Sequence, residues 1–496
     1  MKKINYIHLT ARVFLLLMLI SDCFAQTAVQ KVLLQRCILP DKALKNRLIS
    51  HKIHTYRLHN GLRVYLLENH RLPIFALRLV VKVGAADELN RQQGYAHLFE
   101  HMMFKGSKNI ADGEHFSLIK QIGGNLNAST DYDKTEYWTE ASVDYLDNVL
   151  WLEAERFSNL TFSNANLDNQ RQAVLEEKLL RIDNVPYFKV ASDFMISAWQ
   201  GTAYDHLIIG SEQSLQHAAV SDVRSFFKQY YRPDNTVLVL VGDIVPGSTI
   251  KKIKKYFENN WIADKPKDNI VCKSSLTGSR GSRSLSGRSE TRHDPLAPFP
   301  LYILGWHTAG KQNPDYFAVD ILADILFKGE SSRLKRRLKE QDELVIELLG
   351  MPLTFEQAGI SASAFVPHSY TSFEQIKSVV RDELQRVQKQ GVSSSELCSA
   401  IKNRQLKILK SMSDNRKMAQ LIGDGALFNN DPYYVLHAFS AYQQVDNRQI
   451  KKVAGQYFHE DWLALEITPG PGVRLIKWLM EVLPVSVSKN LERQFL

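Results

Sequence analysis

Two histidines and a glutamate occur together in the short run HLFEH at residues 97–101. Side chains four residues apart on a helix lie one above the other, so the imidazoles of His97 and His101 can face the same point. Glu100 lies on nearly the same face. Two imidazoles with a carboxylate beside them are the groups that a hydrolytic zinc site uses. A solvated polar helix face has the same composition, so this run predicts a zinc site only if other residues complete it.

A catalytic zinc ion usually takes three protein ligands and leaves its fourth position to water. The best source of a third ligand is the predicted helix at residues 167–182, which carries Glu176 and Glu177. These two side chains point about 100° apart on a helix, so only one of them can face a metal. Periodicity alone does not choose between them.

Five further segments accompany the metal motif along the chain. They are YRLHNGLRV (56–64), FKGS (104–107), GGNLNAST (123–130) followed by Asp133, Thr135 and Tyr137, YRPDN (231–235) and VGD (241–243). Together with the H-x-x-E-H motif, they resemble the pitrilysin/insulinase family of zinc peptidases, whose metal motif has this inverted order of the inverzincins. The resemblance is to the two-domain branch that includes the mitochondrial processing peptidase and bacterial periplasmic zinc proteases.

The resemblance implies a role for each residue of the metal motif. Glu177 matches the family's third ligand in its spacing from the second histidine. His97, His101 and Glu177 are therefore expected to bind Zn²⁺, and Glu100 is expected to act as the general base on a metal-activated water.

The resemblance also implies a substrate-binding strand. The residues Asn127, Ala128, Ser129 and Thr130 match the family's edge strand, which holds the substrate backbone as an added β-strand. This mode of binding selects extended or unfolded peptides. An ordinary strand with a polar edge is the alternative interpretation of these residues.

The chain departs from the family pattern at two places. Gln170 stands where the family often has a glutamate, which removes a charge near the third ligand. Family members commonly carry an arginine and a tyrosine in the second domain that reach the substrate carbonyl, but the matching segment here has Lys339 and Ile346. Lysine lacks the planar fork of arginine, and isoleucine has no hydroxyl. We therefore expect a heterodimer in which a related, metal-free partner supplies the missing groups.

Length and composition indicate a soluble protein of two domains. The chain has 496 residues, of which 44% are hydrophobic and 23% charged. Its net charge of +9 is not concentrated in a basic block, which argues against a nucleic-acid partner. Short β-rich runs alternate with longer helical stretches. This pattern predicts an α+β fold of two homologous domains, each a mainly antiparallel sheet covered by helices.

The domain boundaries follow from changes in composition. We expect an N-terminal metal-binding peptidase domain at residues 45–263 and a homologous C-terminal domain at residues 299–475. The segment between them, residues 264–298, is rich in Ser, Gly and Arg, which predicts a flexible linker.

A weak internal repeat supports the homology of the two domains. The sequence FKGE at 327–330 resembles FKGS at 104–107. In this alignment Asp320 stands opposite His97, Ala323 opposite Glu100 and Asp324 opposite His101. The second copy is therefore expected to keep the helix and to lack the metal.

The N-terminus has the features of a signal peptide at residues 1–25. Lys2 and Lys3 precede an apolar run at 13–20, and CFA at 23–25 offers a cleavage site. The apolar run is too short to cross a bilayer as a helix, and no other stretch looks transmembrane. We expect export, most plausibly to a bacterial periplasm, with lipid attachment at Cys23 as the alternative.

The mature chain would contain three cysteines: Cys37, Cys272 and Cys398. An odd number without short spacings argues against a disulfide framework and against cysteine ligation of zinc. Free thiols are the expected state.

The sequence thus predicts a zinc metalloendopeptidase that hydrolyses extended peptides or unfolded polypeptides. The main alternative is an inactive metal-binding subunit that holds extended segments, since a fold does not fix a function. A zinc hydrolase acting on something other than peptides is a further alternative, although the sequence shows no feature of a small polar-ligand pocket. Replacement of Glu100 by Gln separates the first two possibilities.

Overall fold

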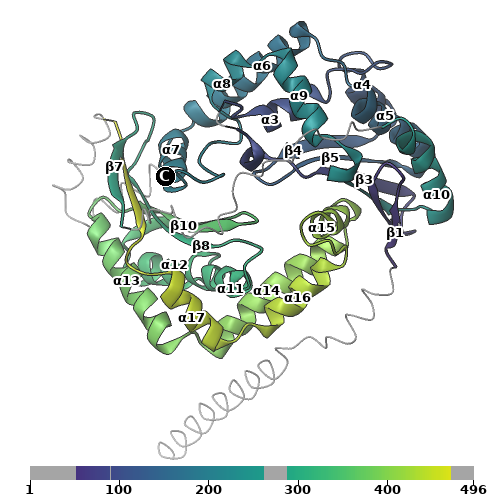
Figure 1. Cartoon of the computed structure of the whole chain (residues 1–496). Coiled ribbons are helices and arrows are strands. Elements are labelled where there is room, and N and C mark those ends of the chain that lie inside the picture. Colours follow the sequence, from purple (N-terminus) through teal and green to yellow (C-terminus); the bar gives the residue numbers. More distant parts are fainter. Residues whose placement is uncertain (1–51, 90, 262–286, 471–496) are drawn as a thin grey trace, which may run out of the picture.

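The computed structural model describes residues 52–89, 91–261 and 287–470 and shows two β-sheets, each covered by helices (Figure 1). The expected signal peptide lies outside the described residues. The α+β fold of two similar domains is confirmed. Among the described residues, no helix is long and apolar enough to cross a membrane.

The first sheet has six strands in the order β1-β2-β6-β3-β5-β4. All neighbouring strands are antiparallel except β2 and β6. The central strand β6 has the sequence TVLVLVG and is buried along its whole length, as expected for a strand covered on both faces. The strands are β1 (His54–Arg57), β2 (Arg63–Glu68), β3 (Ile74–Val81), β4 (Asn125–Thr130), β5 (Thr135–Ser142) and β6 (Thr236–Gly242).

The second sheet repeats this arrangement with five strands in the order β7-β11-β8-β10-β9. Its one parallel pair is β7 with β11, which corresponds to β2 with β6 in the first sheet. By the same correspondence, the edge strand β9 is the counterpart of β4. The strands are β7 (Ser289–His293), β8 (Leu301–Ala309), β9 (Val345–Thr354), β10 (Ala358–Pro367) and β11 (Leu463–Thr468).

The helices of the first domain are α3 (Tyr95–Met102), α4 (Glu114–Gln121), α5 (Leu146–Asn159), α6 (Asn164–Lys178), α7 (Phe188–Ala198), α8 (Glu212–His217), α9 (Val220–Tyr230) and α10 (Pro246–Ile253). Those of the second are α11 (Tyr316–Phe327), α12 (Arg333–Lys335), α13 (Phe373–Gln390), α14 (Ser394–Met412), α15 (Asn415–Phe428), α16 (Tyr434–Gln444) and α17 (Asn447–Tyr457).

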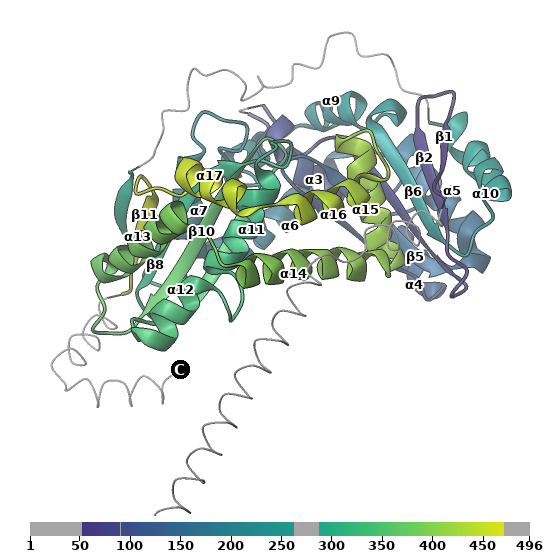
Figure 2. The same ribbon diagram turned by 90° about the horizontal axis from the view of Figure 1, so that it is seen from below.

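Each domain lends one helix to the sheet of the other (Figures 1 and 2). Helix α15 of the second half packs on β3 and β6, where Ile422 is fully buried in a shared apolar cluster. The contact is close, because a Cβ added at Gly423 would lie 3.0 Å from a methyl group of Val80. Helix α7 of the first half packs through Phe194 and Ala198 on the inner face of the second sheet. The two domains therefore share two of their apolar cores.

The structure corrects two expectations from the sequence. The predicted linker at 264–298 lies outside the described residues as far as 286, but 289–293 form the edge strand β7, which pairs with β11. The polar sequence SETRH does not predict a strand, because this segment is held at the sheet edge by its backbone pairing with β11. Cys398 is not a free thiol but is disulfide-bonded. Spacing along the chain does not report which cysteines meet in space.

Candidate metal centre

The helix that carries the histidines, α3, begins at a position that requires glycine. Gly94 has a φ of 94°, and a Cβ there would lie 2.7 Å from the carbonyl oxygen of Ile209. The backbone N–H groups of Gly94 and Ala96 donate to the two carboxylate oxygens of Glu88, each at 2.7 Å. Glu88 is completely buried and lies 3.0 Å from Nε2 of His206. These contacts fix where α3 starts and hence where its side chains point.

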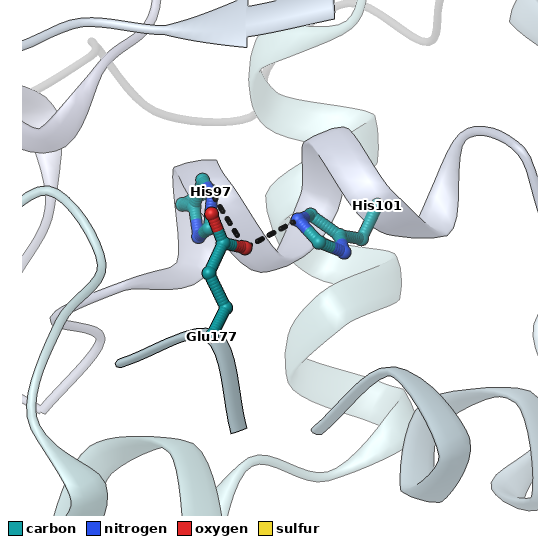
Figure 3. Close-up of side chains that lie close together, drawn as sticks. All are labelled: His97, His101 and Glu177. Carbon is teal, nitrogen blue, oxygen red and sulfur yellow. Dashed lines mark ion pairs between the residues drawn. The ribbon is translucent and has the colours of Figure 1, made fainter. Parts of the chain in front are cut away.

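Three potential metal ligands converge between α3 and α6. His97 and His101 lie on one face of α3, and Glu177 points between them from α6 (Figure 3). One carboxylate oxygen of Glu177 lies 3.7 Å from Nε2 of His97 and 3.4 Å from Nε2 of His101. A tetrahedral zinc ion about 2.0–2.1 Å from each donor holds the donors roughly 3.4 Å apart. The donor set and its spacing therefore fit Zn²⁺.

Burial keeps both imidazoles in the form that binds metals. It lowers the pKa of His97 to about 3, with the neighbouring His101 and Arg181 adding to the effect. Burial also lowers the pKa of His101, although the charge of Glu177 and a hydrogen bond that His101 donates to the side chain of Gln170 oppose this shift. A histidine with a lowered pKa is neutral at pH 7 and offers a lone pair to a cation.

The structure distinguishes the two glutamates that the sequence left open. Glu177 is partly buried beside the histidines, whereas Glu176 is exposed on the outer face of α6. The other carboxylate oxygen of Glu177 forms an ion pair with Nη1 of Arg181 at 2.8 Å. This contact directs the other oxygen towards the histidines. Sequence reasoning missed Arg181, although its position four residues after Glu177 on one helix was the signal.

Glu100 lies beside the three ligands and is not one of them. Burial raises its pKa to about 7, while a hydrogen bond from Thr130 opposes that shift. The Thr130 hydroxyl donates to the Glu100 carboxylate at 2.6 Å. A carboxylate with a pKa near neutrality that is held in one orientation suits a group that accepts and returns a proton.

The predicted substrate segment forms β4, an edge strand next to α3. Asn127 and Ser129 point to the exposed side, whereas Ala128 and Thr130 are partly covered. The side chain of Thr130 is directed at Glu100 rather than outward, a contact that sequence reasoning did not foresee. What β4 leaves open is its backbone edge, since it pairs only with β5 among the described strands.

The two departing residues of the second half lie before and in β9: Lys339 belongs to the helical segment Arg336–Gln341, and Ile346 lies at the start of the strand. Lys339 forms an ion pair with Glu347 at 2.6 Å, and Lys335 contacts the same carboxylate at 2.7 Å. Ile346 is the second residue of β9. The ammonium group of Lys339 is thus already paired within its own domain.

Comparison with known proteins shows the family of the chain. Residues 63–208 match the family described as Insulinase (Peptidase family M16), and residues 218–404 match the Peptidase M16 inactive domain. The chain belongs to peptidase family M16. Two domain types of one family thus follow each other along the chain, and the three candidate metal ligands all lie in the first.

Similar M16 proteins come from bacteria and mitochondria. The zinc protease PqqE of Helicobacter pylori is 26% identical over 81% of this chain and 89% of its own length. A probable β subunit of the mitochondrial processing peptidase from Schizosaccharomyces pombe is 26% identical over 62% of this chain and 68% of its own. A crystal structure of a Helicobacter pylori protease covers 84% of this chain and all of its own, with a TM-score of 0.77 and 24% identity.

Proposed function

We propose that this M16 protein is a zinc metalloendopeptidase that hydrolyses extended peptides or unfolded polypeptides. The observation that carries the proposal is the convergence of His97, His101 and Glu177 with the carboxylate of Glu100 beside them. Several similar proteins are named zinc proteases, which supports the choice of metal. Zinc, when bound there, would lower the pKa of a water molecule and polarise the scissile carbonyl.

The protein's own residues would then move the proton. Glu100 accepts the proton of the attacking water and later gives it to the leaving amine. Its raised pKa, about 7, makes both transfers feasible near neutral pH. Thr130 holds the carboxylate in place by donating its hydroxyl proton in a hydrogen bond to Glu100.

The free edge of β4 would bind the substrate. An extended peptide can add to an edge strand through backbone hydrogen bonds, which requires no particular sequence. Asn127, Ala128, Ser129 and Thr130 form this strand, and Thr130 also contacts Glu100, so an added strand would run beside the general base. A folded protein cannot present its backbone in this way, so the substrate is expected to be a peptide or an unfolded chain.

The active unit is proposed to be a heterodimer with a related, metal-free subunit. Lys339 is paired with Glu347, and Ile346 offers no donor, so this chain provides no evident contact for the substrate carbonyl from these positions. One similar protein is a probable β subunit of the mitochondrial processing peptidase, which supports an enzyme of more than one subunit. Activity of the purified chain alone, as a monomer or homodimer, would contradict this part of the proposal.

Export is proposed from the predicted signal peptide at residues 1–25. The periplasmic protease PqqL of Escherichia coli has the same fold over 90% of this chain, with a TM-score of 0.70. Fractionation of cells that express the chain, with sequencing of the mature N-terminus, tests this localisation.

Zinc analysis and peptide cleavage together test the proposed activity. The wild-type chain is expected to bind one zinc ion, and Glu177→Gln is expected to lose it. Glu100→Gln should keep the zinc but lose cleavage of an unfolded polypeptide in the presence of the partner. Glu176→Gln is the matched control on the exposed face of α6 and should change neither. Retained cleavage by Glu100→Gln would contradict the proposal.

A further inference from the structure

The second domain has a counterpart of the metal site in which an arginine replaces the metal. Asp320 and Asp324 lie on α11 where the histidines lie on α3, and α14 faces them as α6 faces α3. The guanidinium of Arg404, from α14, donates to Asp320 at 2.6 Å and to Asp324 at 2.7 Å. The Tyr442 hydroxyl donates to the other oxygen of Asp320 at 2.6 Å. The guanidinium of Arg404 and two hydrogen-bonded carboxylates therefore occupy the position that corresponds to the candidate metal site of the first domain.

A pocket of about 400 Å³ opens beside this Asp–Arg–Asp cluster. Its walls are the C-terminal end of α11 and one face of α14, with Ile325 and Ala400 among the lining residues. Most of the other lining residues are of polar or charged types, among them Ser399 and Asn403, although carbon atoms provide much of the exposed wall. A concave pocket of this size with convergent polar groups is typical of a small-ligand site.

The charges around the pocket are unequal. Lys328, Arg336, Arg404 and Lys407 all line it, against Asp324 and Glu396. Arg404 binds both aspartates of α11, and its single positive charge balances one of these two carboxylates.

Glu396 is occupied in the same way. Its carboxylate accepts hydrogen bonds from Nε and Nη2 of Arg333, at 2.7 and 2.8 Å, and lies 3.6 Å from Nη2 of Arg336. The acidic side chains are thus already paired by arginines, which leaves two lysines at the mouth of the pocket.

Neither lysine has a close ion pair among the described residues. The ammonium of Lys328 is 3.8 Å from Asp324, which Arg404 already binds at shorter range. Lys407 has no ion-pair partner in the described part of the chain. Burial lowers the pKa of Lys407, and the charges of Lys328 and Arg404 lower it further, whereas the charges of Asp320 and Asp324 oppose the shift. The three cations therefore lie close enough to repel one another, and an anion between them would relieve that repulsion.

We propose that this pocket binds a multiply charged oxyanion, phosphate or carboxylate, between the ammonium groups of Lys328 and Lys407. Its volume exceeds what one inorganic anion needs, so the ligand is a larger molecule that carries the anionic group. Two sources share this chemistry: a phosphate ester and the side chains of an acidic peptide. The hydroxyl of Ser399 and the amide of Asn403 supply further donors.

Calorimetric titration of the full chain at constant ionic strength tests the proposal, with inorganic phosphate and a blocked Glu-Glu dipeptide as separate probes. The double variant Lys328→Gln/Lys407→Gln is expected to bind about tenfold more weakly or not at all, because two charge-assisted hydrogen bonds are lost. Lys410→Gln is the matched control, since Lys410 lies on α14, is exposed and does not line the pocket. Lys328→Arg/Lys407→Arg retains the charges and should retain binding.

Each outcome decides the question. Phosphate binding alone favours a phosphate ester, and peptide binding favours an acidic chain; both support an oxyanion site. No binding of either probe, or equal binding by the double glutamine variant and Lys410→Gln, would overturn it. Loss of binding in the arginine variant as well as in the glutamine variant would also overturn it, provided that both unfold at the parent temperature.

Discussion

At the scale of single residues, the metal centre depends on side chains that do not themselves reach the metal position. Arg181 holds one oxygen of Glu177, and Gln170 bonds to His101. The Thr130 hydroxyl donates a hydrogen bond to Glu100 and so holds the carboxylate of the proposed base. Such outer contacts orient the ligands and the base, and their loss typically costs about 10–100-fold in metal affinity or activity.

Thr130→Val isolates one of these contacts. The substitution keeps the shape of the side chain but removes the hydroxyl that donates to Glu100. We expect kcat to fall about tenfold while zinc content and KM stay close to those of the parent. Ser129→Ala is the control, because Ser129 bonds to Glu136 instead. Equal kcat values for Thr130→Val and the parent, measured with the partner present, would show that Thr130 does not orient the base.

At the scale of the elements, the position of the site depends on where α3 begins. Gly94 and Gly113 each stand directly before a helix, and their φ angles are positive, 94° and 74°. A Cβ at Gly94 would meet backbone atoms within 2.7 Å, but a Cβ at Gly113 would meet nothing within 4 Å. This pair therefore separates the cost of the backbone conformation from the cost of a clash.

Gly94→Ala and Gly113→Ala make that comparison directly. Gly113→Ala should lower the free energy of unfolding by about 1–2 kcal/mol, the cost of a left-handed alanine. Gly94→Ala should cost clearly more and should weaken zinc binding, because α3 must move away from Ile209. Chemical denaturation and zinc titration measure both effects. Similar losses in the two variants would mean that the contact with Ile209 does not position the helix.

The sequence predicted the elements better than their partners. The spacing of His97 and His101 required only a helix, so local geometry made the pair predictable. Glu177 needed the family resemblance, because nothing local distinguishes it from Glu176. The strand β7 was missed because its alternation is polar and its pairing with β11 is long-range. The hydrogen bond from Thr130 to Glu100 could not be predicted, because tertiary packing decides which side chains of two separate elements meet.

At the scale of the whole molecule, the exchange of α7 and α15 joins the domains into one unit. Polar contacts reinforce it: Asp133 accepts hydrogen bonds from the Tyr204 hydroxyl at 3.0 Å and from the backbone of Glu356 at 2.9 Å. Asp133 follows β4 in the first domain, whereas Glu356 lies between β9 and β10 in the second. The strand proposed to bind substrate is thus held close to the second domain.

Ile422→Ala tests whether the two domains unfold together. Ile422 lies on α15 but is fully buried against the first sheet, so its truncation should cost about 2–5 kcal/mol. If the domains form one cooperative unit, hydrogen exchange should accelerate equally at β6 of the first sheet and β8 of the second. Leu406→Ala, at an exposed position on α14, should leave both unchanged. Faster exchange confined to β6 would show that the domains open independently, and the second domain could then not serve as a fixed wall beside β4.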